Sequence, residues 1–297
     1  MHHFGVPEEK KIRVILNTDL KNEVDDQFAV VHALLTESFC LKGIIPAHFG
    51  EDKSPHSMLD SKNEGLLLLE KMGLSGKVPF YDGAEHAMPD PNTPVDSEGA
   101  RLIIREAMSD DPRPLFIAFL GPVTDIASAI LLEPEICNRN VTIVWIGGNA
   151  WPSGGSEYNL KNDVNAANVL FKSTISVWQI PRNVYRMMPV SFAELYTRVH
   201  PYGEIGSYLA QNVIDYNNAR RNIGEYRVLG DSPAIGVMLF EDCGQYVWRS
   251  APQFDSLMHY VHDGRQRPIR VYENIDSRFI MEDFYAKLQL FQEDFKG

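Results

Sequence analysis

The feature that most restricts the fold of this chain is a regular alternation of strand-like and helix-like segments. Apolar, β-branched runs occupy residues 12–16, 41–46, 114–120, 141–146 and 175–179. Helical periodicity fills the intervals. With a short run at 78–81 the alternation repeats about six times, the pattern of parallel strands covered by helices. We therefore predict an α/β fold with a mostly parallel central sheet and helices on both of its faces.

The rest of the chain adds further helices and short strands without dividing it. Helices are expected at 191–199, 202–217, 231–240 and 276–291, and short strands at 78–81, 245–249 and 269–272. No stretch rich in Gly, Ser or Pro and no internal repeat interrupts the 297 residues. Because this length can bury a large core, we predict one domain spanning residues 1–297.

The charge and the cysteines exclude several classes of partner and location. The formal net charge is −12 and the 28 Lys and Arg residues form no long basic run, which argues against nucleic acid or an anionic membrane as partner and favours a neutral or cationic small molecule. Cys40, Cys137 and Cys243 are far apart in apolar contexts, so we expect buried free thiols of a reducing compartment. No targeting segment or membrane span is visible, and a soluble, cytoplasmic protein is expected.

An acidic turn follows the first strand. Between that strand and the next helix the chain places four carboxylates within eight residues: Asp19, Glu23, Asp25 and Asp26. Crowded carboxylates repel one another unless a cation lies among them, and oxygen ligands suit a hard divalent cation. A solvated acidic loop in which Asp25 caps the helix explains the same residues equally well. The turn alone does not decide between these interpretations.

Three polar segments are expected at one edge of the sheet. Ligands of parallel sheets bind beyond the carboxyl ends of the strands. That rule brings together the acidic turn, the GPVT turn at 121–124 and the glycine-rich segment 147–159. Thr124 could also belong to an ordinary strand-to-helix turn, and Asp231 could be a simple helix N-cap.

Four segments in a fixed order carry a family resemblance. The acidic turn, GPVT at 121–124, SEYNLKND at 156–163 and LGDSPA at 229–234 resemble the nucleoside hydrolase family, the inosine-uridine preferring type of N-ribohydrolase. The resemblance spans nearly the whole chain. It implies a Rossmann-like core and calcium-dependent hydrolysis of the N-glycosidic bond of a ribonucleoside or related ribosyl compound. It also implies a role in purine or pyrimidine salvage and a homodimer or homotetramer.

The resemblance assigns roles around a calcium ion. Asp19, Asp26 and Asp231 are similar to calcium ligands of the family, and Thr124 matches a threonine whose backbone carbonyl is a further ligand. Asp19 would also take a proton from a metal-bound water, which would be the nucleophile. Asp25 would face the ribose hydroxyls. Asn22 and the neighbouring Glu23 are extra residues of a longer turn, and the resemblance implies no role for them.

The same resemblance assigns ribose contacts. Glu157 and Asn159 match a pair that holds the sugar's 5′-hydroxyl and neighbouring oxygens, together with Asp25 and Asp231. In extended backbone two side chains separated by one residue point the same way, so the spacing of Glu157 and Asn159 would permit joint contact.

The side facing the leaving group departs from the family. Many members carry a histidine immediately before the last ligand aspartate, as an acid for the departing base, whereas this chain has Gly230. Asn149 and Trp151 occupy positions near a base-contacting asparagine of the family. Other possible donors are Tyr185, Tyr226, Arg220, Arg221 and Arg227. The alternative function is therefore a sugar or nucleoside binding protein with little or no catalysis, and a purely structural calcium site is a third possibility.

Overall fold

A seven-stranded sheet forms the centre of the protein, in the order β2-β1-β3-β4-β5-β11-β8. The computed structural model describes residues 4–220, 224–262, 264 and 267–296. The strands of the central sheet are β1 (Ile12–Thr18), β2 (Phe39–Pro46), β3 (Leu115–Phe119), β4 (Val141–Ile146), β5 (Ser176–Ile180), β8 (Tyr246–Ser250) and β11 (Pro268–Tyr272). Each neighbouring pair is parallel except β11 and β8, which run antiparallel. The predicted fold class is confirmed.

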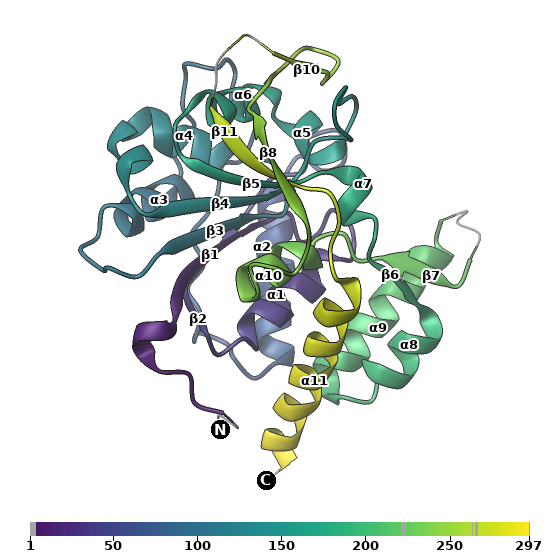
Figure 1. The fold of residues 1–297 in the computed structure, drawn as a ribbon. Helices are drawn as coiled ribbons and strands as arrows, with labels where there is room; N and C mark the ends of the chain where they lie inside the picture. The colour runs from purple at the N-terminus through teal and green to yellow at the C-terminus, as the bar shows by residue number, and fades with distance from the viewer. Residues whose placement is uncertain (1–3, 221–223, 263, 265–266, 297) are drawn as a thin grey trace.

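Helices cover both faces of this sheet (Figure 1). On one face lie α1 (Asp26–Leu34), α2 (Ser57–Lys71), α10 (Ser232–Leu239) and α11 (Ser277–Lys296). On the other lie α3 (Glu98–Ala107), α4 (Thr124–Leu132) and α6 (Val164–Lys172). The first strand divides its side chains between the two layers, because successive residues of a strand point to opposite faces. Val14 and Leu16 enter one core and Ile15 enters the other, each of them fully buried.

Smaller elements complete the fold around the two edges of the sheet. They are η1 (Glu8–Lys10), η2 (Pro134–Asn138), α5 (Tyr158–Asn162), α7 (Arg182–Tyr185), α8 (Phe192–Arg198), α9 (Gly203–Asn218), and the strand pairs β6 (Pro189–Ser191) with β7 (Tyr226–Val228) and β9 (Gln253–Phe254) with β10 (Tyr260–Val261). In Figure 1 the α8, α9 and β6–β7 group projects beside the sheet. Strand β7 of this group pairs with β6, which lies in the segment that follows β5.

Several predicted details are wrong. Residues 78–81 form no strand, because Pro79 lacks an N–H for a ladder, and Phe80 makes a single bridge to Ile44. The cysteines are free as expected, but only Cys243 is buried.

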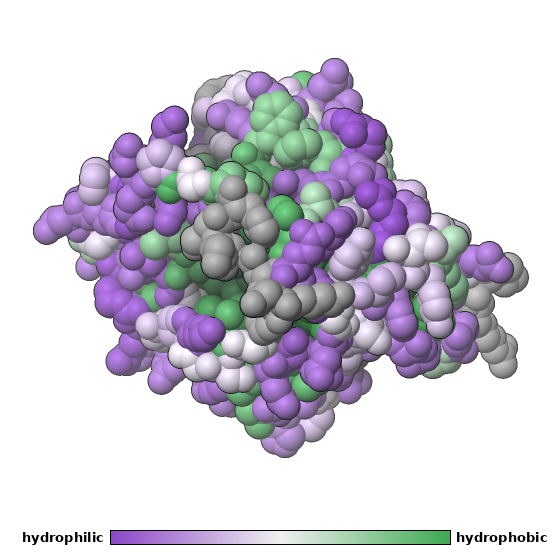
Figure 2. Space-filling view, turned by 90° about the horizontal axis from the view of Figure 1, so that it is seen from below, coloured by the Kyte–Doolittle hydropathy of each residue, from purple (hydrophilic) through white to green (hydrophobic). Residues whose placement is uncertain are grey.

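Hydrophilic residues cover most of the face seen from below, with smaller apolar areas between them (Figure 2). Among the helices of the described residues, none combines the length and the apolar character that crossing a bilayer requires.

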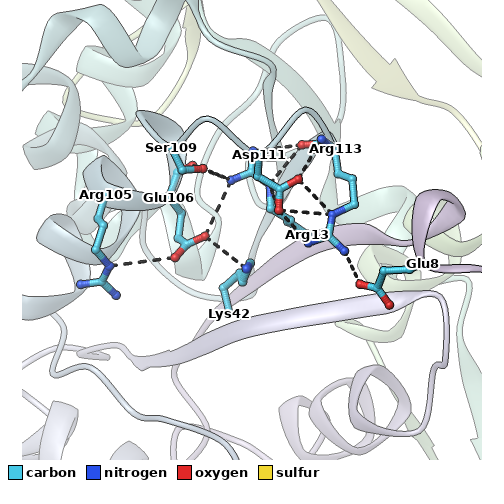
Figure 3. Close-up of polar contacts among 8 residues, drawn as sticks. All are labelled: Glu8, Arg13, Lys42, Arg105, Glu106, Ser109, Asp111 and Arg113. Carbon is cyan, nitrogen blue, oxygen red and sulfur yellow. Dashed lines mark hydrogen bonds and ion pairs between the residues drawn. The ribbon is translucent and has the colours of Figure 1, made fainter.

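A buried arginine ties β1 to the loop before β3, at the sheet edge opposite the acidic turn (Figure 3). Arg13 is 3% exposed and donates to the carbonyl oxygens of Glu106, at 2.6 Å, and Arg113, at 3.0 Å. Its guanidinium also lies 3.7 Å from the Glu106 carboxylate and 3.9 Å from that of Asp111. This network closes the amino-terminal edge of the sheet.

Arg13→Met is expected to lower the free energy of unfolding by about 3 kcal/mol, because buried carbonyl and carboxylate oxygens lose their donor. Urea denaturation followed by circular dichroism measures the change. Arg105→Met is the matched control: its side chain is 55% exposed and its guanidinium lies 4.0 Å from the Glu106 carboxylate, so a change within about 0.5 kcal/mol is expected. Equal losses in the two variants would contradict the role given to Arg13.

Candidate functional site

The acidic turn lies at the carboxyl end of β1 and is largely buried. Asp19 and Asp26 are 1% and 2% exposed. The Thr18 hydroxyl donates to Asp26 Oδ1 at 2.5 Å, and the Asn22 amide donates to Asp19 Oδ2 at 3.1 Å. Asn22, which had no predicted role, thus orients a buried carboxylate. The interpretation as a solvated loop does not fit this burial.

Asp231 approaches the turn from the other end of the chain. It precedes α10, and Asp25 precedes α1, yet neither side chain caps its helix. Asp25 Oδ2 instead accepts a hydrogen bond from the Gly230 N–H at 2.9 Å. One carboxylate oxygen each from Asp25, Asp26 and Asp231 lie within 4.8 Å of one another. The carboxylates of Asp25 and Asp231 therefore belong to this cluster and do not cap the helices that follow them.

Burial and mutual repulsion disfavour the charged forms of these carboxylates. Burial raises the pKa of Asp25 to about 8, with further increases from Glu23 and Asp26. Burial also raises the pKa of Asp26, to about 6. The pKa values of Asp19 and Asp231 are raised by burial and then by the charges of Asp26 and Asp25. A cation among these oxygen ligands would relieve the repulsion, so the donor set fits a hard divalent ion such as calcium.

The compact group of oxygens differs from the ligand set that the resemblance implies, since it contains Asp25 where the resemblance has Asp19. Asp19 nevertheless lines the same small pocket as Asp25, Asp26 and Asp231. The GPVT turn also abuts it, because a Cβ at Gly121 would lie 3.0 Å from Asp19 Cγ.

Thr124 begins α4 and is buried. Its hydroxyl donates to Asp163 Oδ2 at 2.8 Å and lies 2.9 Å from His48 Nε2. These bonds hold the start of α4 beneath the site. A ligand role for the Thr124 carbonyl stays a prediction.

Glu157 has extended backbone immediately before α5, whereas Asn159 lies within that helix, so the extended backbone expected for the pair is found at Glu157 only. Glu157 is the N-cap residue, and its carboxylate accepts from the N–H groups of Asn159 and Leu160. The Asn159 amide donates at 2.8 Å to the carbonyls of Leu120 and Ile146, where β3 and β4 end. Its carbonyl oxygen takes no part in those two bonds. Both side chains line the pocket of Asp19 and Asp231 despite the helical backbone.

Two adjoining pockets are present at this edge. The acidic pocket has a volume of about 100 Å³ and the second about 620 Å³. They share Glu23, Asp25, Glu157, Tyr158, Tyr185 and Gly230. We call the second the basic chamber, because four cations line it: Lys161, Arg182, Arg186 and Arg227.

Tyr185 and Gly230 form the junction between the two pockets. The Tyr185 hydroxyl donates to Glu157 Oε1 at 3.0 Å, and burial followed by the Glu157 charge raises the pKa of this phenol. A Cβ at Gly230 would lie 3.1 Å from the Tyr185 ring and 3.2 Å from Asp25 Oδ2. Where relatives carry histidine, this chain therefore has a tyrosine ring packed against a glycine.

Asn149 and Trp151, which the sequence placed near the base, form hydrogen bonds within the protein. The Asn149 amide donates to Ser156 O at 2.9 Å, and Trp151 Nε1 donates to Gln179 Oε1 at 3.0 Å. The Trp151 ring also lies 4.6 Å from that of Tyr260. Among the described residues, neither Asn149 nor Trp151 lines the acidic pocket or the basic chamber.

Of the other possible donors, Tyr185, Tyr226 and Arg227 line the basic chamber, whereas the Arg220 guanidinium covers the Tyr216 ring at 3.3 Å. Arg221 lies outside the described residues. The sequence analysis missed Arg182 and Arg186. The signal for them was their position directly after β5, whose carboxyl end meets the same sheet edge.

A family model supports the resemblance read from the four segments. Residues 14–278 match the model described as inosine-uridine preferring nucleoside hydrolase. The chain belongs to this family.

Individual nucleoside hydrolases are distant relatives. The chain is 26% identical over 212 residues to "Probable uridine nucleosidase 2" of Oryza sativa subsp. japonica, covering 62% of this chain and 59% of the relative. Identity to "Uridine nucleosidase 1" of Arabidopsis thaliana is 25% over 211 residues, covering 63% and 61%. The chain thus spans about three fifths of the length of these curated relatives.

The fold is shared with solved nucleoside hydrolase structures. "Purine-Preferring Ribonucleoside Hydrolase from Gardnerella vaginalis" superposes with a TM-score of 0.75 at 20% identity, covering 95% of this chain and 99% of that chain. At this identity the likeness shows the fold alone.

Proposed function

We propose that this protein hydrolyses the N-glycosidic bond of a ribonucleoside or a related ribosyl compound, with calcium as its cofactor. The observation that carries the proposal is the convergence of the carboxylates Asp19, Asp25, Asp26 and Asp231 on one pocket that Glu157 and Asn159 also line. Family membership and the uridine nucleosidases among the relatives support the same reaction.

Asp25, Asp26 and Asp231 would hold the calcium ion, with Asp19 and the carbonyl of Thr124 as the further ligands that the resemblance implies. When bound, the ion supplies positive charge that offsets the buried carboxylates, orients water and binds vicinal ribose hydroxyls.

The side chains that line the acidic pocket can supply the negative charge, the general base and the sugar contacts that the reaction needs. Cleavage of an N-glycosidic bond passes through an oxocarbenium-like state, which nearby carboxylates stabilise by their negative charge. Asp19 accepts a proton from the attacking water, whose oxygen bonds to the anomeric carbon as the bond to nitrogen breaks. The departing base keeps the electron pair of that bond and takes a proton from solvent. Glu157 and the amide oxygen of Asn159 bind sugar hydroxyls and fix the anomeric carbon.

The test measures free base and reducing sugar released from a panel of ribonucleosides, with and without a calcium chelator. Release that stops with the chelator and returns with added Ca²⁺ supports the proposal. No release from any riboside, together with ribose binding, would instead favour the binding protein, an alternative to which Gly230 lends weight because it supplies no acid for the leaving group. Calcium binding without sugar binding would leave only a structural ion.

The homodimer or homotetramer stays a prediction, which light scattering can check.

Tyr185→Phe is expected to raise KM about tenfold with a smaller change in kcat. The variant removes one hydrogen bond to Glu157 but keeps the ring against Gly230, and a bond to a charged acceptor is worth about 1.5 kcal/mol or more. Steady-state kinetics with uridine gives kcat and KM separately. Tyr196→Phe, at an exposed tyrosine, serves as the control. A loss confined to kcat would show that Tyr185 acts on the reacting atoms instead.

A further inference from the structure

We propose that the basic chamber binds a negatively charged group carried by the substrate, so that the preferred ribosyl compound is an anion. The inference rests on the proposed function and specifies the substrate class of the same site. It reverses the expectation from composition, which favoured a neutral or cationic ligand.

The charge of the chamber is opposite to that of the protein. The chain carries a formal net charge of −12, yet Lys161, Arg182, Arg186 and Arg227 all line one chamber of about 620 Å³. Its acidic lining residues are Glu23, Asp25 and Glu157, and all three are shared with the acidic pocket. The four cations therefore line the chamber alone, whereas its carboxylates are common to both pockets.

Two of the four cations have acidic partners. Arg227 forms an ion pair with Glu23, and Lys161 lies 3.5 Å from Asp52. Arg182 and Arg186 differ: within the part of the chain that the structure describes, neither guanidinium makes a hydrogen bond or an ion pair. These two residues are four apart, and the Arg186 N–H bonds to the Arg182 carbonyl at 3.2 Å.

Residues spaced in this way lie on one face of a helical turn, where like charges repel. An anionic group between them would remove that repulsion. Carboxylate and phosphate both match the planar, five-donor guanidinium group, which binds them through paired hydrogen bonds.

The chamber is placed to meet either end of a bound riboside. Its wall contains Gly230, at the position where the family carries the histidine of the leaving-group side, and also Glu157, which the proposed function assigns to sugar hydroxyls. The anion could thus be a carboxylate on the base or a phosphate on the ribose. The two sources share one chemistry, and matched substrates separate them.

The experiment compares kcat/KM for three probes: uridine, orotidine, which adds a carboxylate to the base, and uridine 5′-monophosphate. We expect at least one anionic probe to exceed uridine about tenfold. Arg182→Gln combined with Arg186→Gln should lower that anion-to-uridine ratio at least tenfold. Arg139→Gln, at an exposed arginine outside the chamber, should leave the ratio unchanged. A higher ratio for orotidine identifies a base carboxylate, and a higher ratio for the monophosphate identifies a sugar phosphate.

Equilibrium binding keeps this inference separable from the proposed function. Calorimetry with orotidine and uridine 5′-monophosphate is performed on the wild-type protein and on the double arginine variant, whose folding is checked by circular dichroism. If no riboside is cleaved but an anionic probe binds through the arginines, the inference stands and the proposed function fails. If uridine is cleaved and neither anionic probe binds more tightly nor reacts faster, the inference is overturned and the proposed function stands.

Discussion

Asp19→Asn is expected to lower kcat by about 10³-fold or more while the protein stays folded, since general bases contribute factors of this order. Asp19 is buried at the end of β1 and held by the Asn22 amide, with five further carboxylates lining the same pocket. The asparagine keeps nearly the same shape but accepts no proton. Removing one charge also relieves repulsion with Asp25 and Asp26, so the metal-free protein should not lose stability.

Asp110→Asn is the control for this substitution, because Asp110 is exposed at the opposite edge of the sheet. Single-turnover measurement of base release compares the two variants, and circular dichroism checks their folding. Asp19→Asn protein that retains more than about a tenth of the wild-type kcat would exclude Asp19 as the base.

Saturating Ca²⁺ is expected to raise the Tm of the wild-type protein by roughly 8 °C. A ligand at a thousand times its Kd stabilises the folded state by about 4 kcal/mol, and for a chain of this size about 1 kcal/mol shifts Tm by roughly 2 °C. The physical cause is the group of buried carboxylates whose charged forms are unfavourable without a cation. Thermal unfolding with Ca²⁺ and with a chelator measures the difference.

Asp231→Asn separates this effect from general ion binding. The variant loses a ligand of the proposed site and one of the mutually repelling charges. Its Tm in chelator should equal or exceed that of the wild type, and its response to Ca²⁺ should be largely lost. Asp110→Asn should respond as the wild type does. An equal response in the Asp231 and Asp110 variants would place the calcium ion elsewhere or nowhere.

The fold was predictable because burial leaves a local pattern. Strand β1 is buried on both faces, so Val14, Ile15 and Leu16 had to be apolar without alternation, and this pattern marks a parallel sheet. The prediction of a strand failed where the residues are apolar but the backbone cannot form the hydrogen bonds of a sheet. Residues 78–81 are apolar enough for a strand, but Pro79 cannot donate to a ladder.

The acidic half of the candidate site was also visible in the sequence. Asp19, Asp25 and Asp26 are close in the chain and follow a strand end, so their proximity needed no tertiary contact. The family resemblance added Asp231, Glu157 and Asn159, and the structure brings them to the same pocket. The helical backbone at Asn159 was not predicted, because the five-residue helix α5 is too short to leave a periodic signal.

The sequence by itself determined the parallel α/β fold, the family and the clustered carboxylates, because each depends on patterns within short segments of the chain or on the order of those segments. Only the tertiary structure decided that Asp25 bonds to Gly230, 205 residues away, and that Tyr185 fills the space beside that glycine. It likewise decided that the cations of α5, α7 and β7 line one chamber. Such contacts depend on how distant segments pack together, which local residue patterns do not encode.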